Sequence, residues 1–133
     1  MKGRAKKEGL KVSIDVSTHQ SDGIAVVGLR GRITLGEGTE ALRDTVRDLL
    51  SQGQNRILLN LGEVNYIDSS GIGELVSAFT AAKRQGGEVK LLNLTKKVHD
   101  LLQITKLYTV FDVKDDEASA VASFGSSQER VAG

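Results

Sequence analysis

Residues 56–73 read RILLNLGEVNYIDSSGIG, and this stretch decides the fold. Its first part, residues 56–61, is a short and continuously apolar run, which is typical of a strand buried on both faces of a parallel sheet. Residues 68–70 (Asp-Ser-Ser) then open a helix, because Asp and Ser are common N-cap residues. The apolar side chains that follow recur at helical spacing: Ile72, Leu75, Val76 and Phe79. A buried strand followed by an amphipathic helix predicts a crossover unit of an α/β sheet.

Two strands and a helix are expected before this stretch. Residues 10–17 alternate apolar and polar side chains, and the Ser-Asp-Gly break at 21–23 separates them from a second apolar run at 24–29, which predicts a β-hairpin. From Thr39 to a stop signal at Gly53, apolar residues recur at helical spacing: Leu42, Val46, Leu49 and Leu50. This pattern predicts an amphipathic surface helix.

Alternating strands and helices are expected after it. The helix that opens at residues 68–70 ends near four stop signals: Lys83, Arg84, Gly86 and Gly87. Further elements are predicted as a strand at 88–94, a helix capped by Thr95, a strand at 110–113 and a helix at 115–124. The order ββαβαβαβα predicts an α/β fold, with an N-terminal hairpin, a mixed and mostly parallel sheet and about four helices. One domain is expected at 10–124, between flexible tails at 1–9 (basic) and 125–133.

Composition excludes several classes of function. The chain has 133 residues, no Cys and a formal net charge of +1, and most of the positive excess lies at residues 2–7. Without Cys there are no disulfides and no thiolate sites, and the low charge argues against direct nucleic-acid binding. No apolar stretch approaches the ~20 residues that cross a bilayer. A cytoplasmic protein without a membrane span is the expectation.

Catalytic and metal sites have little support. Ser69 lies where a strand turns into a helix, but the flanking glycines of a nucleophile elbow are present only after it. His19, in a predicted hairpin loop, and His99, on a polar helix face, have no neighbours that would orient a catalytic base. Neither histidine has a partner at metal-ligand spacing, and the acids at 112–117 lack a calcium-loop pattern. We therefore expect no enzyme activity, no metal and no cofactor.

The glycines at the start of the second helix are unusual. Gly71 and Gly73 would each cost up to ~1 kcal/mol relative to Ala inside a helix. Either this turn packs closely against the sheet, or the backbone of another protein must approach it. The polar residues before them also have an ordinary structural reading as helix caps.

These residues carry a family likeness. The chain resembles the STAS domain of bacterial anti-sigma factor antagonists from about Val12 to Phe124, on the following residues: Asn60-Leu61, Val64, the run 66–73, Gly86-Gly87, 91–94, Val98 and Leu102. The Asp-Ser-Ser-Gly-Ile-Gly segment after an apolar strand is the specific part of this likeness, whereas the helix patterns alone fit many α/β domains.

The resemblance implies a partner-switching module that is not an enzyme. In this family, the unphosphorylated domain binds an anti-sigma factor that is also a serine kinase, and the sigma factor is released. The kinase uses ATP to phosphorylate the serine after the Asp, here Ser69, and a PP2C-type phosphatase removes the phosphate. The implied partner-binding residues are Asp68, Ser69, Ser70, Gly71, Ile72, Gly73 and Thr34. The alternative is a non-switching STAS adaptor subunit of a transport complex or signalling scaffold, in which Ser69 serves only as a cap.

The chain departs from the family pattern at two positions. Thr34 stands where the family often has an Asp near the partner surface, in the segment Gly31-Arg32-Ile33-Thr34. Lys106 stands where a Gly is common in the turn after the third helix. The first departure concerns the identity of the partner, and the second concerns only the geometry of a turn.

Overall fold

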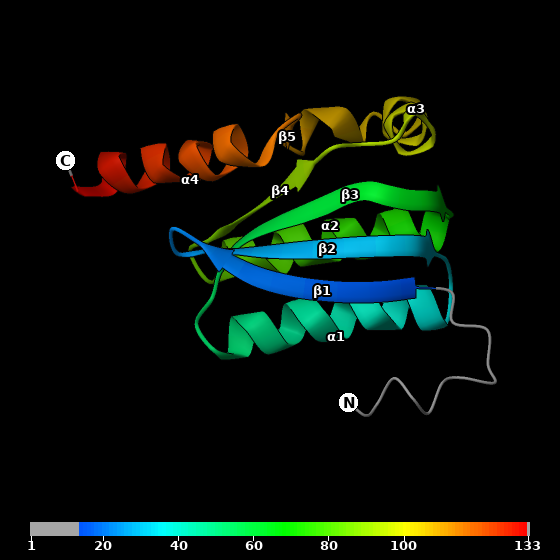
Figure 1. The fold of residues 1–133 in the computed structure, drawn as a ribbon, viewed down its shortest axis with the longest axis horizontal. Helices are drawn as coiled ribbons and strands as arrows, with labels where there is room; N and C mark the ends of the chain where they lie inside the picture. The colour runs from blue at the N-terminus through cyan, green and yellow to red at the C-terminus, as the bar shows by residue number, and fades with distance from the viewer. Residues whose placement is uncertain (1–13, 133) are drawn as a thin grey trace.

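The computed structural model describes residues 14–132, with side chains as far as Phe124. Five strands form one sheet in the order β1-β2-β3-β4-β5 (Figure 1). The strands are β1 (Ile14–Ser21), β2 (Ile24–Ile33), β3 (Arg56–Ile67), β4 (Glu88–Leu92) and β5 (Val113–Lys114). The helices are α1 (Glu37–Ser51), α2 (Ser69–Arg84), α3 (Lys96–Ile104) and α4 (Glu117–Ala132), with a 3-10 turn at Leu107–Thr109. The predicted order and fold class are confirmed.

The sheet is mixed, as the alternating pattern predicts. β1 pairs with β2 in antiparallel fashion, and the other neighbours are parallel. Because successive side chains of a strand point to opposite faces, the buried residues divide into two clusters. Ala25, Val27 and Ile57 face α1 and α2, whereas Val26 and Leu58 belong to a smaller cluster with Phe124 of α4. Helices α1 and α2 therefore cover one face, and α4 covers part of the other (Figure 1).

The long pairing of β2 with β3 positions the functional site. The sequence predicts a strand only at 56–61, but β3 continues to Ile67, because β2 pairs with it beyond the point where β4 ends. The register brings Ile33 opposite Ile67. Since parallel strands run in the same direction, the segments that follow these two residues emerge at one edge of the sheet.

Other elements differ in their limits from the predictions. The last strand was expected at 110–113, but the strand is Val113–Lys114, and the 3-10 turn at Leu107–Thr109 precedes it. Phe111, which precedes β5, packs edge-to-face against Phe79 of α2 with ring centroids 5.6 Å apart. α1 begins two residues before Thr39. The prediction that His19 lies in a hairpin loop is wrong, because His19 pairs with Val26 inside the hairpin.

The two ends of the chain differ from the predicted domain limits or lie outside the described residues. The predicted basic tail at 1–9 lies outside the described residues, and so do residues 10–13 of the first predicted strand. Helix α4 continues beyond Phe124, where the domain was expected to end. The predicted flexibility of 125–133 stays a prediction, because side chains are described only as far as Phe124. Among the helices of the described segment, none is long and apolar enough to cross a membrane.

Candidate functional site

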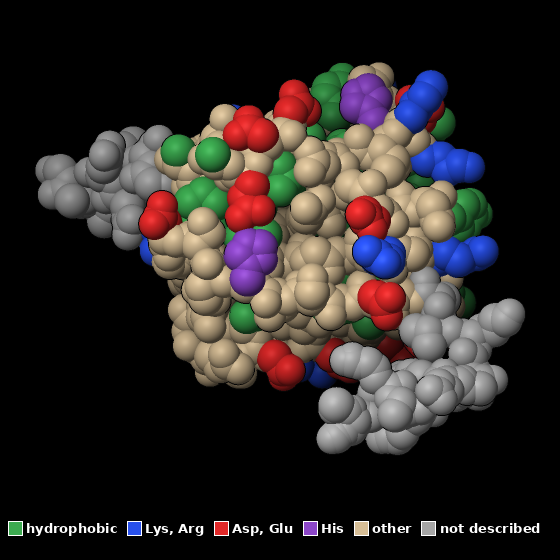
Figure 2. Space-filling view, in the orientation of Figure 1, with side chains coloured by type: hydrophobic (Ala, Val, Ile, Leu, Met, Phe, Trp, Pro, Cys, Tyr) green, Lys and Arg blue, Asp and Glu red, His purple; other side chains and the backbone are tan. Residues whose placement is uncertain are grey.

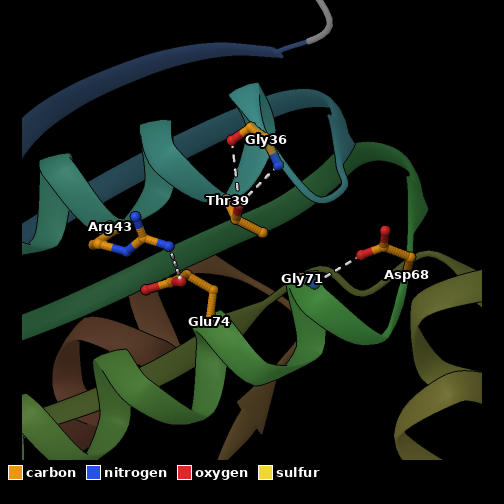
Figure 3. Close-up of polar contacts among 6 residues, drawn as sticks. All are labelled: Gly36, Thr39, Arg43, Asp68, Gly71 and Glu74. Carbon is orange, nitrogen blue, oxygen red and sulfur yellow. Dashed lines mark hydrogen bonds and ion pairs between the residues drawn. The ribbon is translucent and has the colours of Figure 1, made fainter.

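The candidate site lies where β2 and β3 end. The backbone N–H of Asp68 donates to the carbonyl oxygen of Ile33 across 3.4 Å, so the start of α2 is fastened to the end of β2. The segment after β2 leads into α1, and the segment after β3 leads directly into α2. Two helix starts and the loop between β2 and α1 therefore share one edge of the molecule (Figure 3).

Asp68 is the residue that holds this edge together. Its Oδ1 accepts a hydrogen bond from the backbone N–H of Gly71 at 2.8 Å, and its Oδ2 accepts one from the N–H of Leu35 at 3.2 Å. The pKa of Asp68 is lowered, chiefly because the Gly71 N–H donates to the ionised carboxylate, with a further contribution from Leu35. One charged side chain thus caps α2 and tethers the loop that precedes α1.

The capping role falls to Asp68 and not to Ser69. Asp68 has extended backbone angles and is the N-cap, whereas Ser69 is the first residue of the helix. The side chain of Ser69 is exposed and makes no hydrogen bond with any described residue. Ser69 is therefore not the cap of α2, and its exposed hydroxyl is accessible to another molecule.

The two glycines of the first turn have different surroundings. A Cβ atom on Gly71 would lie 2.2 Å from the carbonyl oxygen of Ile33, so this position must be glycine for the helix to pack against β2. A Cβ atom on Gly73 would meet nothing within 4 Å, and Gly73 is exposed. Close packing explains Gly71 but gives no reason for Gly73.

The loop between β2 and α1 is fixed by Thr39. The Thr39 N–H donates to the carbonyl oxygen of Thr34 at 3.1 Å, and its hydroxyl oxygen accepts from the N–H of Gly36 at 3.2 Å. Gly36 has a φ of 103°, which favours glycine. Further along the helices, Arg43 of α1 and Glu74 of α2 form an ion pair at 3.0 Å (Figure 3). The loop and the α1–α2 pair are thereby held in one arrangement.

The structure gathers the residues that the sequence singles out. Thr34 and the segment 68–73 lie at the same edge, where Ser69 and Gly73 are exposed and Thr34, Asp68 and Ser70 are half-buried. Gly71 is buried, and Ile72 is only 5% exposed and belongs to the core. A partner would therefore meet the neighbours of Gly71 and Ile72 first, while these two residues hold the turn in place.

Sequence reasoning missed the exposed apolar and aromatic side chains of this edge. Leu35, in the loop that Asp68 tethers, is 76% exposed, and Tyr66 at the end of β3 is 42% exposed. Apolar residues beside a strand end are ordinarily expected in the core. Tyr66 lies in the part of the β2–β3 register that extends beyond the end of β4, and Leu35 lies in the loop that follows β2. Figure 2 shows apolar, Lys and Arg side chains together along the edge toward which β2 and β3 point in Figure 1.

This arrangement is suited to recognition by another protein. The two histidines make their described contacts elsewhere, His19 with Glu117 at 2.9 Å and His99 with Asp100 at 3.7 Å. Neither of these contacts orients a base toward Ser69. An accessible hydroxyl at a helix N-terminus, an open glycine and an exposed leucine instead form a small surface on which a partner's side chains and backbone can lie.

Comparison with known proteins agrees with this architecture. A family model described as the STAS domain matches residues 15–120. The anti-sigma-B factor antagonist of Bacillus subtilis (strain 168) is 32% identical over 104 residues, which cover 78% of this chain and 92% of the relative.

Solved structures share the fold. The chain superposes on an anti-sigma factor antagonist from Mycobacterium paratuberculosis with a TM-score of 0.75 at 18% identity, covering 84% of this chain and 94% of the other. It superposes on the Bacillus cell fate determinant SpoIIAA in the phosphorylated form with a TM-score of 0.66 at 20% identity, covering 82% and 98% of the two chains.

Proposed function

The chain belongs to the STAS domain family, and on this premise we propose that it is an anti-sigma factor antagonist switched by phosphorylation of Ser69. In the unphosphorylated state it binds an anti-sigma factor with serine kinase activity, so that a sigma factor is released. That kinase transfers the γ-phosphoryl group of ATP to the Ser69 hydroxyl, and a PP2C-type phosphatase removes it. The protein works in the cytoplasm as a binding module and catalyses nothing itself.

The observation that carries this proposal is the freedom of Ser69. Its side chain is exposed, and the cap of α2 is already supplied by Asp68. A phosphoryl group at this position therefore displaces no interaction on which the described fold depends. It would also meet the positive end of the α2 dipole, which favours negative charge.

The same geometry explains why phosphorylation would release a partner. Phosphorylation adds about 1.5 to 2 negative charges at neutral pH. This charge would appear next to the carboxylate of Asp68, which tethers the loop of Leu35, and in the same first turns of α2 as the exposed Gly73. A bound protein would then have to bury an uncompensated charge, which is unfavourable at an interface. The signal is a local change of the surface and needs no rearrangement of the fold.

The test is a phosphorylation and binding experiment with purified proteins. The chain is incubated with ATP and with each serine-kinase anti-sigma factor encoded in the same genome, and the product is examined by intact mass and site mapping. We expect one phosphate at Ser69, none in Ser69→Ala, and normal modification of Ser70→Ala. Phosphate on Ser70 in the unmodified sequence would show that the assignment is wrong.

Calorimetry then measures the switch itself. We expect Ser69→Ala to bind the kinase like the parent chain, and Ser69→Asp to bind roughly thirtyfold to several thousandfold more weakly, because burying an unpaired charge costs ~2 to 5 kcal/mol. Both variants should melt like the parent chain, because neither loses the Asp68 cap. Tight binding without phosphorylation, and equal affinity of Ser69→Asp, would instead identify a non-switching adaptor.

A further inference from the structure

Three side chains from three different elements meet beside the candidate site. The guanidinium carbon of Arg32 (β2) lies 5.2 Å from the centre of the Tyr66 ring (β3), and the Nζ of Lys97 (α3) lies 5.9 Å from it. We name Arg32, Tyr66 and Lys97 the Tyr66 cluster. Both distances are within the range of a cation–π interaction. The ring therefore draws two positive charges to one place on the surface.

The positive charge of the Tyr66 cluster is not neutralised within the described part of the chain. No described carboxylate lies within ion-pair distance of Arg32 or Lys97. Two acids on the same elements are already engaged, since Glu63 pairs with Arg30 at 2.8 Å and Asp100 pairs with Lys96 at 3.0 Å. Because the whole chain has a formal net charge of only +1, this is a local concentration of charge.

The cluster adjoins the site of Ser69. Arg32 lies opposite Tyr66 in the register of β2 with β3, one residue before the pair Ile33 and Ile67 with which both strands end. Asp68 and Ser69 follow at once, and Leu35 beyond the end of β2 is 76% exposed. Two cations, a half-exposed aromatic ring and an exposed leucine thus extend the docking edge along the ends of β2 and β3.

We propose that the Tyr66 cluster receives an acidic segment of the partner protein, one that carries carboxylates toward Arg32 and Lys97 and an apolar side chain toward Leu35. This inference rests on the proposed function and adds the chemistry of the partner's surface. It also explains why phosphorylation would weaken partner binding. A phosphate on Ser69 carries about 1.5 to 2 negative charges, enough to offset the two cations and to repel an acidic segment.

A protein partner fits this surface better than a nucleic acid. A nucleic-acid site needs a basic face or stripe that follows the phosphate backbone. The cluster has two cations around one ring, and the exposed Leu35, three residues after Arg32, offers an apolar contact. Carboxylate-bearing protein surfaces combine both kinds of contact within a small area, with charged groups at the rim of an apolar centre.

The first test compares salt dependence in matched double variants. Arg32→Gln/Lys97→Gln removes the charges of the cluster, and Arg47→Gln/Arg84→Gln removes two exposed charges elsewhere on α1 and α2. The binding partner is the kinase that the phosphorylation experiment identifies. We expect the first variant to bind it about 3- to 10-fold more weakly than the parent chain at ~50 mM salt, and with the same affinity at ~500 mM. The second variant should change the affinity less than about twofold at either salt concentration. Equal affinity of the cluster variant and the parent chain at low salt would overturn the proposal.

The second test needs no identified partner. The folded chain, labelled for NMR, is titrated with a short oligoglutamate peptide and with an oligothymidylate of equal charge. We expect the peptide to shift the resonances of Arg32, Tyr66 and Lys97 most, and the cluster variant to lose this response. Shifts spread evenly over the surface, or stronger binding of the oligothymidylate, would show that the inference is wrong.

The two tests separate the inference from the function on which it rests. If the kinase neither binds nor phosphorylates the chain, the proposed function fails, whatever the titration shows. If Ser69 is phosphorylated and releases the kinase, but the cluster variant and the parent chain bind with the same salt dependence, only the acidic partner surface is refuted.

Discussion

Two glycines, two positions apart in α2, are expected to respond oppositely to the same substitution. Gly71→Ala places a methyl group against the carbonyl of Ile33, so it should lower the free energy of unfolding by about 1–3 kcal/mol or more. Gly73→Ala meets open space in a helical position, so it should raise stability by ~0.4–1 kcal/mol. Urea unfolding followed by circular dichroism measures both changes.

Binding distinguishes a surface role of Gly73 from a structural one. An added methyl group in a closely packed interface costs ~1–3 kcal/mol, so Gly73→Ala should bind the kinase about fivefold or more weakly while folding more stably. A variant that gains stability and keeps full affinity would remove Gly73 from the partner surface. Gly71→Ala is the internal comparison, because its first effect should be on folding.

Lys106 shows how a departure from a family pattern affects a turn. It follows the C-cap of α3 and has a φ of 63°, the left-handed conformation that favours glycine. Lys106→Gly should therefore stabilise the domain by up to ~1 kcal/mol, because the strain of a side chain in this region exceeds the added chain entropy of glycine. Gln103→Gly, at an exposed position inside α3, should destabilise the domain by up to ~1 kcal/mol. Thermal melts of the two variants check the contrast in sign.

At the scale of elements, the helices and strands were predicted correctly where the spacing of apolar residues reflects which side chains are buried. The apolar run at 56–61 and the apolar stripe of α2 identified the central strand and its helix, because the two pack against each other in the larger core. The continuation of β3 to Ile67 could not be predicted in this way, because its polar residues there are exposed and only the pairing with β2 keeps the chain extended. Likewise, Thr34 and the segment 68–73 were singled out through the family resemblance, whereas the exposure of Leu35 and the contact of Lys97 with Tyr66 depend on tertiary packing.

Asp68 links two elements, and its charge makes that link depend on pH. Its folded pKa is lowered, so its contribution to stability is complete at pH values above the ordinary carboxyl pKa and is lost as pH falls through the folded pKa. Asn can still cap a helix but has one acceptor oxygen, so Asp68→Asn loses either the Gly71 or the Leu35 hydrogen bond. We expect it to be about 1 kcal/mol less stable at neutral pH.

The sign of this effect can be checked by unfolding the two proteins over a range of pH. The difference in the free energy of unfolding between the parent chain and Asp68→Asn should become smaller below about pH 4, where the carboxyl group of the unfolded chain begins to take up a proton. If this difference in stability stays constant down to pH 2, the stability lost in Asp68→Asn comes from the geometry of the hydrogen bonds and not from the charge of the carboxylate. Asp44→Asn, an exposed change on α1, should leave stability at neutral pH almost unchanged.

At the scale of the whole molecule, the two faces of the sheet have different roles. The larger core beneath α1 and α2 supports the edge that carries Ser69, and the smaller cluster on the opposite face holds α4 (Figure 1). Phe124 is fully buried in the smaller cluster, and Lys90 of β4 lies 5.1 Å from the centre of its ring. Because the two clusters lie on opposite faces, a change beneath α4 should leave the docking edge intact.

Phe124→Ala tests this separation. Removing a fully buried phenylalanine costs ~3–5 kcal/mol, so the variant should lose much of its stability. Hydrogen exchange should increase in α4 and β4 before it increases in α1 and α2, since only the first pair adjoins the smaller cluster. Under conditions in which the sheet stays folded, the variant should be phosphorylated at Ser69 and should bind the kinase like the parent chain. Ala122→Ser, an exposed change two residues away in α4, should alter neither exchange nor binding. Equal acceleration of exchange in α2 and α4, or loss of kinase affinity in the still-folded variant, would show that the two faces act as one unit.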